Sequence, residues 1–492
     1  MQVGVPRQQL RLLPSTSGNA IWPVLKGACP SDEPDSCTTL RGSFFNPNES
    51  TTWSNIGLYG LLLTEEGPLG LAANGIFGFD QATLGFPGSP DMPTLNHTII
   101  GGFLDTSLYV GTLGLYPPAV NLSTFNDPQL SFIASLRNQK SIPSTSWAYT
   151  AGAQYKQPTA FGSLTLGGYD TTRFKPNTIS YSFGPDQSRD LVVGLQDIQT
   201  NNKSLLPTGI YTFLDSLVPD IWLPIEACQR FESAFGLSYN DTAQRYLVND
   251  THHVELAAKA PTITLRLGPS SSSGPSSDIV MSYGSLDLSY QDVKSGYKSR
   301  YFPLRRADNA SMYTLGRSFF QDAYVVADYE RKNFSVSQGM FPNSSNAQSI
   351  VAILPPGPVA SANVKRFGRK EMAATIASSI LFMVVVTAFV WWWRGKQRQN
   401  HLKEKEQRSN STSPSNQIYL GNELPSSNTR HELQYSRPIT PELENPDRYP
   451  FSGLTHTRRE NPAEMAVNEQ VSAALQGLNG RPRLELPGEE VV

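Results

Sequence analysis

The chain has 492 residues, too many for a single ordinary domain, and 39% of them are hydrophobic, which is enough for a substantial core. Its formal net charge of −2 excludes bulk electrostatic attraction to nucleic acid or acidic lipid, so we expect no nucleic-acid partner. Glycine, proline and serine are plentiful and helix-periodic stretches are few, which favours short strands and turns over helix bundles.

The first residues lack the features of a secretory leader. Residues 1–6 contain no basic segment followed by an apolar run. A membrane span is predicted near the other end of the chain. We therefore expect either that this span targets the chain or that the natural protein starts upstream of Met1.

Two segments 200 residues apart repeat one pattern. Residues 13–22 and 212–222 each contain a hydrophobic run, a small turn that carries hydroxyl groups, and the pair Ile-Trp at the same offset. Asp215 in the second segment corresponds to Ser15 in the first. Two carboxylates that share one proton and hold one water form a known type of hydrolytic site. Here one of the two positions is serine.

Three cysteines occur in the chain. Cys29 and Cys37 bracket a short polar loop, and a disulfide between them is plausible in a secreted domain. The alternative is two exposed free thiols. Cys228 is the odd cysteine, which is either buried and inert or has a partner outside this chain.

Residues 1 to about 350 show alternating apolar patterns broken by turn residues, which is an all-β signature. One short helix is expected at residues 226–235, with Ala227, Phe231 and Ala234 on its apolar face. The clearest strand predictions are a strand and turn at residues 161–170, a strand leading into a short apolar element at 313–320, and a hairpin at 324–334 with a charged turn at 330–332.

Nine Asn-x-Ser/Thr sequons precede the predicted span, which favours a luminal or extracellular location for this part. These predicted glycosylation sites are Asn48, Asn96, Asn121, Asn202, Asn240, Asn249, Asn309, Asn333 and Asn343.

Residues 372–393 contain no charge and would reach roughly 33 Å as a helix, close to the hydrocarbon thickness of a bilayer. Basic residues flank both ends but are more numerous on the C-terminal side, which predicts a single-pass type I protein. Residues 351–371 are expected to form a stalk. Residues 394–492 are polar and poor in large apolar groups, so we expect a disordered cytoplasmic tail with an unknown cytosolic partner. The plasma membrane or the secretory pathway is the expected location.

Segments spread over residues 3–340 resemble, in order, motifs of the pepsin-like aspartic proteases. They are residues 3–8 (IGTPxQ), 15–22 (DTGSSxxW), Cys29 and Cys37 (the small first disulfide), 44–53 (FxPxxSsTy), 78–80 (GYD), 111–115 (GILGL), 166–170 (fGGiD), 214–216 (the second catalytic loop) and 313–316 (wiLG). With the span and the polar tail, the chain looks most like uncharacterised fungal membrane proteins that carry this domain.

The resemblance implies a mainly β, two-lobed pepsin-like fold, with an N-terminal lobe at residues 1–186 and a C-terminal lobe at 187–350. It also implies that a signal peptide, any propeptide and the first interlobe strand are missing before Met1. No cofactor or metal is implied.

The resemblance also assigns the site positions. Ser15 occupies the first catalytic position and Asp215 the second, while Thr16 and Ser216 match the hydroxyls that brace the two loops. Several accompanying residues depart from the family pattern: Ser17 and Leu217 replace loop glycines, Gly18 and Val218 replace outer hydroxyls, and the flap tyrosine position falls on Pro68, with Tyr59 as a weaker substitute.

A serine hydroxyl does not ionise near neutral pH, so Ser15 cannot act as an acid or base. We expect no second carboxylate beside Asp215. Asp220 is interpreted as a surface residue at the start of a helix, because it lies in the same lobe as Asp215.

Three functions follow from these observations. The first is a membrane-anchored, catalytically inactive protein whose cleft binds a peptide or protein partner. The second is an active membrane-tethered aspartic endopeptidase at the cell surface. The third is a structural surface glycoprotein, for which a filled cleft would be evidence.

Overall fold

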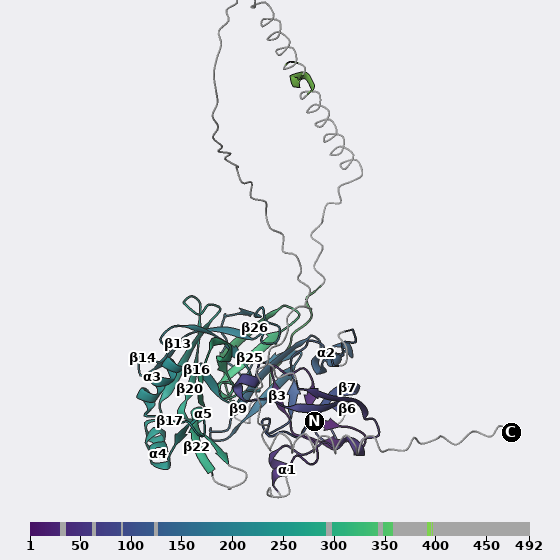
Figure 1. The fold of residues 1–492 in the computed structure, drawn as a ribbon, viewed down its shortest axis with the longest axis horizontal. Coiled ribbons are helices and arrows are strands. Elements are labelled where there is room, and N and C mark those ends of the chain that lie inside the picture. The colour runs from purple at the N-terminus through teal and green to yellow at the C-terminus, as the bar shows by residue number, and fades with distance from the viewer. Residues whose placement is uncertain are drawn as a thin grey trace, which may run out of the picture. The chain divides into compact units, whose positions relative to one another are not determined.

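The computed structural model describes residues 1–29, 36–61, 65–89, 92–122, 126–291, 298–342, 348–357, 391–394 and 396. The described residues up to Gly357 belong to one compact unit. Within it, strands form two large sheets, one from each half of the sequence, and a further sheet that joins the halves (Figure 1). The mainly β, two-lobed architecture predicted from the sequence is confirmed.

The N-terminal lobe is built on one sheet with the strand order β2-β1-β6-β7-β4-β8-β3, and β5 pairs with β6 at its side. Its strands are β1 (Gln2–Val3), β2 (Gln8–Gln9), β3 (Leu13–Ser15), β4 (Ile21–Trp22), β5 (Ser54–Gly60), β6 (Asn74–Thr83), β7 (Thr94–Phe103) and β8 (Thr112–Gly114).

The C-terminal lobe contains the corresponding sheet, with the order β20-β19-β13-β15-β24-β16-β23 and with β14 beside β13. Its strands are β13 (Val192–Thr200), β14 (Lys203–Ser204), β15 (Ile210–Leu214), β16 (Ile221–Pro224), β19 (Thr262–Gly268), β20 (Ser277–Ser282), β23 (Leu304–Ala307) and β24 (Thr314–Leu315). A smaller sheet with the order β17-β18-β22-β21 belongs to the same half: β17 (Ser238–Asn240), β18 (Arg245–Val248), β21 (Leu288–Gln291) and β22 (Lys298–Phe302).

Strands from both halves share the sheet β10-β9-β25-β26-β12, in which β25 and β26 lie between β9 and β12. Its members are β9 (Ser146–Ala153), β10 (Ala160–Leu166), β12 (Tyr181–Ser182), β25 (Ala323–Asp328) and β26 (Asn333–Gln338), and a separate pair joins β11 (Gly168–Asp170) to β27 (Ile350–Ala352). The strand predictions at 161–170 and 313–320 and the hairpin prediction at 324–334 are confirmed.

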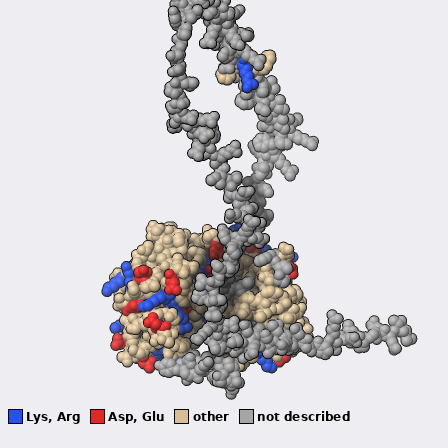
Figure 2. Space-filling view, in the orientation of Figure 1, with Lys and Arg blue, Asp and Glu red and all other residues tan. Residues whose placement is uncertain are grey.

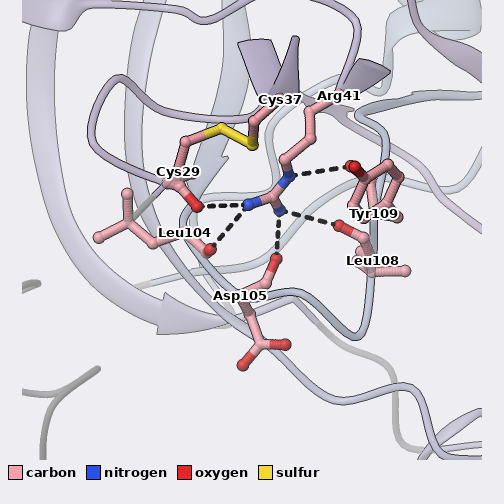
Figure 3. Close-up of a disulfide and its surroundings, with 8 residues drawn as sticks. Cys29, Cys37, Arg41, Leu104, Asp105, Leu108 and Tyr109 are labelled. Atoms are coloured by element: carbon pink, nitrogen blue, oxygen red, sulfur yellow. Dashed lines mark hydrogen bonds between the residues drawn. A yellow bond between two sulfur atoms is a disulfide. The ribbon is translucent and has the colours of Figure 1, made fainter. Parts of the chain in front are cut away.

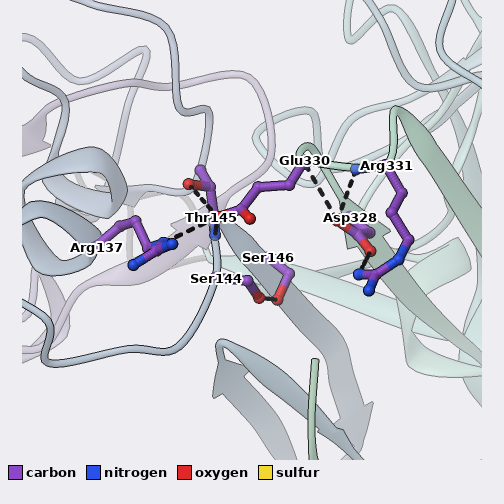
Figure 4. Close-up of polar contacts among 7 residues, drawn as sticks. All are labelled: Arg137, Ser144, Thr145, Ser146, Asp328, Glu330 and Arg331. Atoms are coloured by element: carbon purple, nitrogen blue, oxygen red, sulfur yellow. Dashed lines mark hydrogen bonds and ion pairs between the residues drawn. The ribbon is translucent and has the colours of Figure 1, made fainter. Parts of the chain in front are cut away.

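The charged turn of that hairpin connects it to the N-terminal half (Figure 4). Arg137, on helix α2 (Phe132–Asn138), donates from Nε to a Glu330 carboxylate oxygen at 2.9 Å, and the Thr145 amide donates to the same oxygen at 2.9 Å. Burial of Glu330 favours its neutral form, but the hydrogen bonds from Arg137 and Thr145 outweigh burial and lower its pKa. The hairpin is therefore fixed to α2 by an ion pair.

Short helices cover the edges of the sheets: α1 (Cys37–Leu40), α3 (Ile225–Phe235), α4 (Asp250–Lys259) and α5 (Tyr283–Leu286). Helix α3 confirms the prediction at 226–235, but Ala234 is exposed and Phe235 is buried in its place. Residues 227, 231 and 235 follow a spacing of four, which keeps them on one face of the helix. On the face in Figure 2, positive and negative side chains are interspersed over the lobe that carries α3 and α4.

The predicted disulfide between Cys29 and Cys37 is confirmed. Arg41 lies beside it with 1% of its surface exposed, and its guanidinium donates to a ring of backbone carbonyls (Figure 3). The acceptors are Ala28 at 2.7 Å, Asp105 at 2.5 Å, Tyr109 at 3.0 Å, Leu108 at 3.3 Å and Leu104 at 3.4 Å. Arg41 thus ties the disulfide-bonded loop to the segment that follows β7.

Among the residues that the structure describes, no helix is both long enough and apolar enough to cross a membrane. Of the predicted span, residues 372–390 lie outside the described residues, as do residues 358–371 of the predicted stalk and almost all of the predicted tail. Six of the predicted sequon asparagines are exposed and Asn121 and Asn333 are partly buried, whereas Asn343 lies outside the described residues.

Candidate active site

The two repeated loops occupy equivalent places in the two lobes. In the N-terminal lobe, β8 pairs in parallel with β3 and antiparallel with β4; in the C-terminal lobe, β24 pairs in parallel with β15 and antiparallel with β16. Ser15 ends β3, and Asp215 directly follows β15. The topology therefore gives residues 15 and 215 the same position in their lobes.

Both loops pass close to a glycine at the end of the pairing strand: Gly114 is the last residue of β8, and Gly316 directly follows β24. A Cβ atom at Gly114 would lie 2.5 Å from the Gly18 carbonyl oxygen, and a Cβ atom at Gly316 would lie 2.2 Å from the Asp220 carbonyl oxygen. Real Cβ atoms do not approach backbone so closely, so only glycine fits at these two places. The sequence keeps both, and with them the shape of the loops.

Thr16 and Ser216 join the two loops through four reciprocal hydrogen bonds. The Thr16 amide donates to Ser216 Oγ at 3.0 Å, and the Ser216 amide donates to Thr16 Oγ1 at 3.0 Å. Each hydroxyl in turn donates to a carbonyl of the opposite lobe: Ser216 to Pro14 at 2.8 Å and Thr16 to Leu214 at 3.4 Å. Both side chains are buried, so this network holds the two lobes together at the centre of the site.

Ser15 makes its contacts within its own loop. Its Oγ accepts a hydrogen bond from the Gly18 amide at 2.9 Å and lies 3.5 Å from Ser17 Oγ. The side chain is fully buried. These contacts make Ser15 a loop-shaping residue, because its oxygen is occupied by the backbone turn.

Asp215 is 4% exposed and is held by donors from both lobes. The Leu217 amide donates to Asp215 Oδ1 at 2.8 Å, and the Ser17 hydroxyl donates to the same oxygen at 3.1 Å. Behind the loop, Arg317 Nε donates to the Ser216 carbonyl at 2.9 Å. Ser17, which replaces a family glycine, is therefore the side chain by which the first loop contacts the carboxylate.

A second carboxyl group lies beside Asp215, contrary to the expectation from the sequence. Glu66 is 3% exposed, and its carboxyl group interacts electrostatically with that of Asp215. Burial, and after it the neighbouring Asp215, raise the pKa of Glu66 to about 8, while Arg189 opposes the shift. The raised pKa favours the protonated form of Glu66 at neutral pH.

Arg189 completes the charged cluster around Asp215. Its guanidinium stacks over the Phe213 ring at 3.7 Å from the centroid and donates to Thr314 Oγ1 at 2.8 Å and to the Ser311 carbonyl. Burial lowers the pKa of Arg189, while the charges of Asp215 and Glu66 raise it. The cluster therefore holds one guanidinium group and two buried carboxyl groups.

The space next to this cluster is small. A cavity of about 20 Å³ is lined by Ser17, Arg189, Asp190, Phe213 and Asp215, among others. This volume accommodates roughly one water molecule. In this conformation the site can bind a water beside Asp215 but has no room there for a peptide.

Asp220 is not a surface residue, so that interpretation is wrong. It is 2% exposed, precedes β16 and pairs with Arg305 at 2.9 Å and with Arg245 at 3.7 Å. The two arginines come from strands that are remote in sequence. The residues next to Asp220 in the sequence therefore could not reveal that it is buried and paired. Asp220 is a buried ion-pair partner in the C-terminal lobe.

Tyr59 and Cys228, two further candidates from the sequence, have structural roles. The Tyr59 ring packs edge-on against Phe77 with centroids 6.1 Å apart, on strand β5. Cys228 is buried, its thiol lies 3.4 Å from the Arg305 carbonyl, and burial raises its pKa to about 12. Cys228 therefore fits the buried and inert alternative. Among the described residues, no cluster of His, Cys, Asp and Glu could hold a metal ion.

Sequence reasoning missed Glu66 and Arg189. The available signal was the pair of acidic residues at 65 and 66, just before the position where the flap tyrosine was sought.

A family model described as eukaryotic aspartyl protease matches residues 1–339. Among curated proteins, none matches the chain.

Proposed function

Since the chain belongs to the eukaryotic aspartyl protease family, we propose that it is a membrane-anchored member whose cleft binds a peptide or protein segment without cleaving it. The observation that carries this proposal is the position of Ser15. It occupies the place equivalent to Asp215, and its oxygen is bound within its own loop. The loop that should supply the partner carboxylate cannot polarise a scissile carbonyl or take up a proton from water.

Glu66 does not take over the missing role in this arrangement. Its pKa is raised, chiefly by burial, and the cavity beside Asp215 holds about one water. That cavity has no room for a substrate carbonyl next to the Asp215 side chain. The bracing network of Thr16 and Ser216 supports an intact two-lobed scaffold, and a scaffold of this kind also serves binding.

A structural surface glycoprotein is the second candidate, and the small size of the cavity favours it. The buried charges at the centre of the site argue for a binding role instead. Arg189, Asp215 and Glu66 carry a desolvation cost that apolar side chains at the same places would avoid. Buried polar groups between two lobes suit a binding site, because they can replace their contacts with one another by contacts with a ligand.

The membrane anchor in this proposal is the uncharged segment 372–393, and the sequons before it support a luminal or extracellular ectodomain. The plasma membrane or the secretory pathway is the proposed location. The polar segment 394–492 would then carry a site for a cytosolic partner.

Purified full-length chain should leave a degenerate peptide library uncut between pH 3 and pH 6. The expected mass spectra are identical for the wild type and Asp215→Asn, because both lack a functional pair of acids. Peptides retained on the immobilised wild type should be recovered intact. Cleavage products that disappear in Asp215→Asn would establish the endopeptidase alternative, and a failure to retain any peptide would favour the structural one.

A further inference from the structure

A second and much larger cavity lies outside the candidate active site. Its volume is about 670 Å³, and it shares no lining residue with the small cavity beside Asp215. Its walls come from the turn after β9, the end of helix α4, the segment that runs from β20 through α5 to β21, and the 3-10 helix η4 (Phe319–Gln321). The volume falls within the range of about 300–1,000 Å³ that small-molecule sites occupy.

Tyr155 forms one wall of this cavity and is held in place from two sides. Its ring lies against Gly284, where a Cβ atom would be 2.5 Å from Tyr155 Cδ2, so a side chain at residue 284 would displace the ring. The Tyr155 hydroxyl donates to Asp322 Oδ1 at 2.5 Å, and Asp322 is 3% exposed. An aromatic surface is therefore fixed in the cavity before any ligand arrives, which lowers the entropic cost of binding.

The charge of the cavity is balanced by the protein itself. Asp287 is the only charged residue among the described residues that line it. Its carboxylate pairs with Arg300 Nη1 at 3.3 Å and lies 3.1 Å from His253 Nδ1. The cavity thus offers no free charge for an ionic ligand, and a ligand without net charge fits it best.

Neutral hydrogen-bonding groups are available on separate walls. The side chains of Gln154 and Ser289 are exposed and make no hydrogen bond with any residue that the structure describes. Gln321 donates from Nε2 to the Ser285 carbonyl at 3.1 Å, which leaves its Oε1 as an acceptor. Leu288 adds apolar surface. A sugar ring, with hydroxyl groups around its rim and C–H groups on its faces, matches this combination of amides, a hydroxyl and an aromatic ring.

We propose that this cavity binds a neutral saccharide of one or two rings. A peptide is the competing occupant, because β21 lies at the edge of its sheet and could pair with an extended strand. The side chains of a peptide, however, would find one leucine and one carboxylate that is already paired. The site lies apart from the paired loops, so this inference goes beyond the proposed function and does not depend on it.

The saccharide has two possible sources. Asn249, an expected glycosylation site, is the N-cap of helix α4, and its side chain accepts a hydrogen bond from the His252 amide. Ala257 and Ala260, at the other end of this helix, line the cavity. The ten residues of α4 extend about 15 Å, a distance that an oligosaccharide of several rings covers. The ligand is therefore either a glycan linked to Asn249 or a saccharide from outside the chain.

Calorimetric titration of the full-length chain, freed of N-linked glycans by enzyme, tests the proposal. The probes are cellobiose, mannobiose and diacetylchitobiose, and at least one should bind. Ala257→Trp should abolish binding, because the indole fills part of the cavity. Ala258→Trp is the matched control, since Ala258 is exposed on the same helix but does not line the cavity, and it should bind as the wild type does. Gln154→Ala should weaken binding about fivefold through one lost hydrogen bond.

The proposal is overturned if no probe binds, if binding survives in Ala257→Trp, or if Ala258→Trp loses it as well. Peptides from the degenerate library that the wild type retains and Ala257→Trp does not would show a peptide site instead.

The same titration on the glycosylated chain distinguishes the two sources. Thr251→Ala removes the sequon but leaves Asn249 as the helix cap. Weaker binding that Thr251→Ala restores assigns the cavity to the chain's own glycan, and unchanged binding assigns it to an external saccharide. Each result supports a saccharide site. Failure of every probe leaves peptide binding at the paired loops untouched, so the two proposals fail separately.

Discussion

Replacing Arg41 with methionine is expected to lower the free energy of unfolding by about 4 kcal/mol, the largest single-residue effect that we predict. Arg41 is 1% exposed and donates to the Ala28 carbonyl next to the disulfide and to the Asp105 carbonyl in the segment that follows β7. Methionine fills much of the same volume but provides no donor. Several buried carbonyl oxygens would lose their partner at once, and each costs about 1–3 kcal/mol when it is left unsatisfied.

Urea unfolding followed by fluorescence measures this effect. Arg230→Met is the matched control, because Arg230 is an exposed residue of helix α3 with one contact, to the Ser204 carbonyl at 3.3 Å. The control should change stability by no more than about 0.5 kcal/mol. A loss below about 1 kcal/mol in Arg41→Met would show that the carbonyls find other partners.

The double variant Thr16→Val and Ser216→Ala is expected to lose about 4 kcal/mol of stability. Thr16→Val keeps the volume of the side chain and removes the oxygen, which leaves the Ser216 amide without its acceptor. Ser216→Ala removes the acceptor of the Thr16 amide and the donor to the Pro14 carbonyl. Because the four bonds form one network, the two single losses should not be additive.

A double-mutant cycle by denaturant titration checks this second prediction. The exposed Thr208 gives the control Thr208→Val, which should be nearly neutral. Additive losses within about 0.3 kcal/mol would indicate that the hydroxyls act independently and do not brace the lobes as one unit.

The sequence predicted the features that depend on local spacing. Ser15 and Asp215 could be paired because the same strand order in each lobe imposes the same offset to Ile-Trp. The disulfide between Cys29 and Cys37 and the hairpin at 324–334 are also local and could be recognised. Gly114 and Gly316 could be placed from the motifs at 111–115 and 313–316. The structure adds the reason for glycine there, which is the close approach of the loop backbone.

The remainder depends on contacts between remote segments. Glu66 is brought near Asp215 because the residues that follow it pack onto the core through Leu69 and Leu71, and sequence gives no measure of that packing. Asp220 is buried because Arg245 and Arg305 come from other strands. The environments of Glu66 and Asp220 are thus set by residues far away in the sequence, which the neighbouring residues do not identify.

The central claim is that catalysis has lapsed in a retained scaffold, and opening the cleft tests it most directly. Glu66→Ala removes the buried carboxyl group that interacts electrostatically with Asp215. Incubated with the degenerate peptide library at pH 3–6, this variant should produce the same uncut mass spectrum as Glu66→Ala combined with Asp215→Asn. Cleavage by Glu66→Ala that the second substitution abolishes would contradict the account, because the chain would then be a working peptidase that Glu66 inhibits.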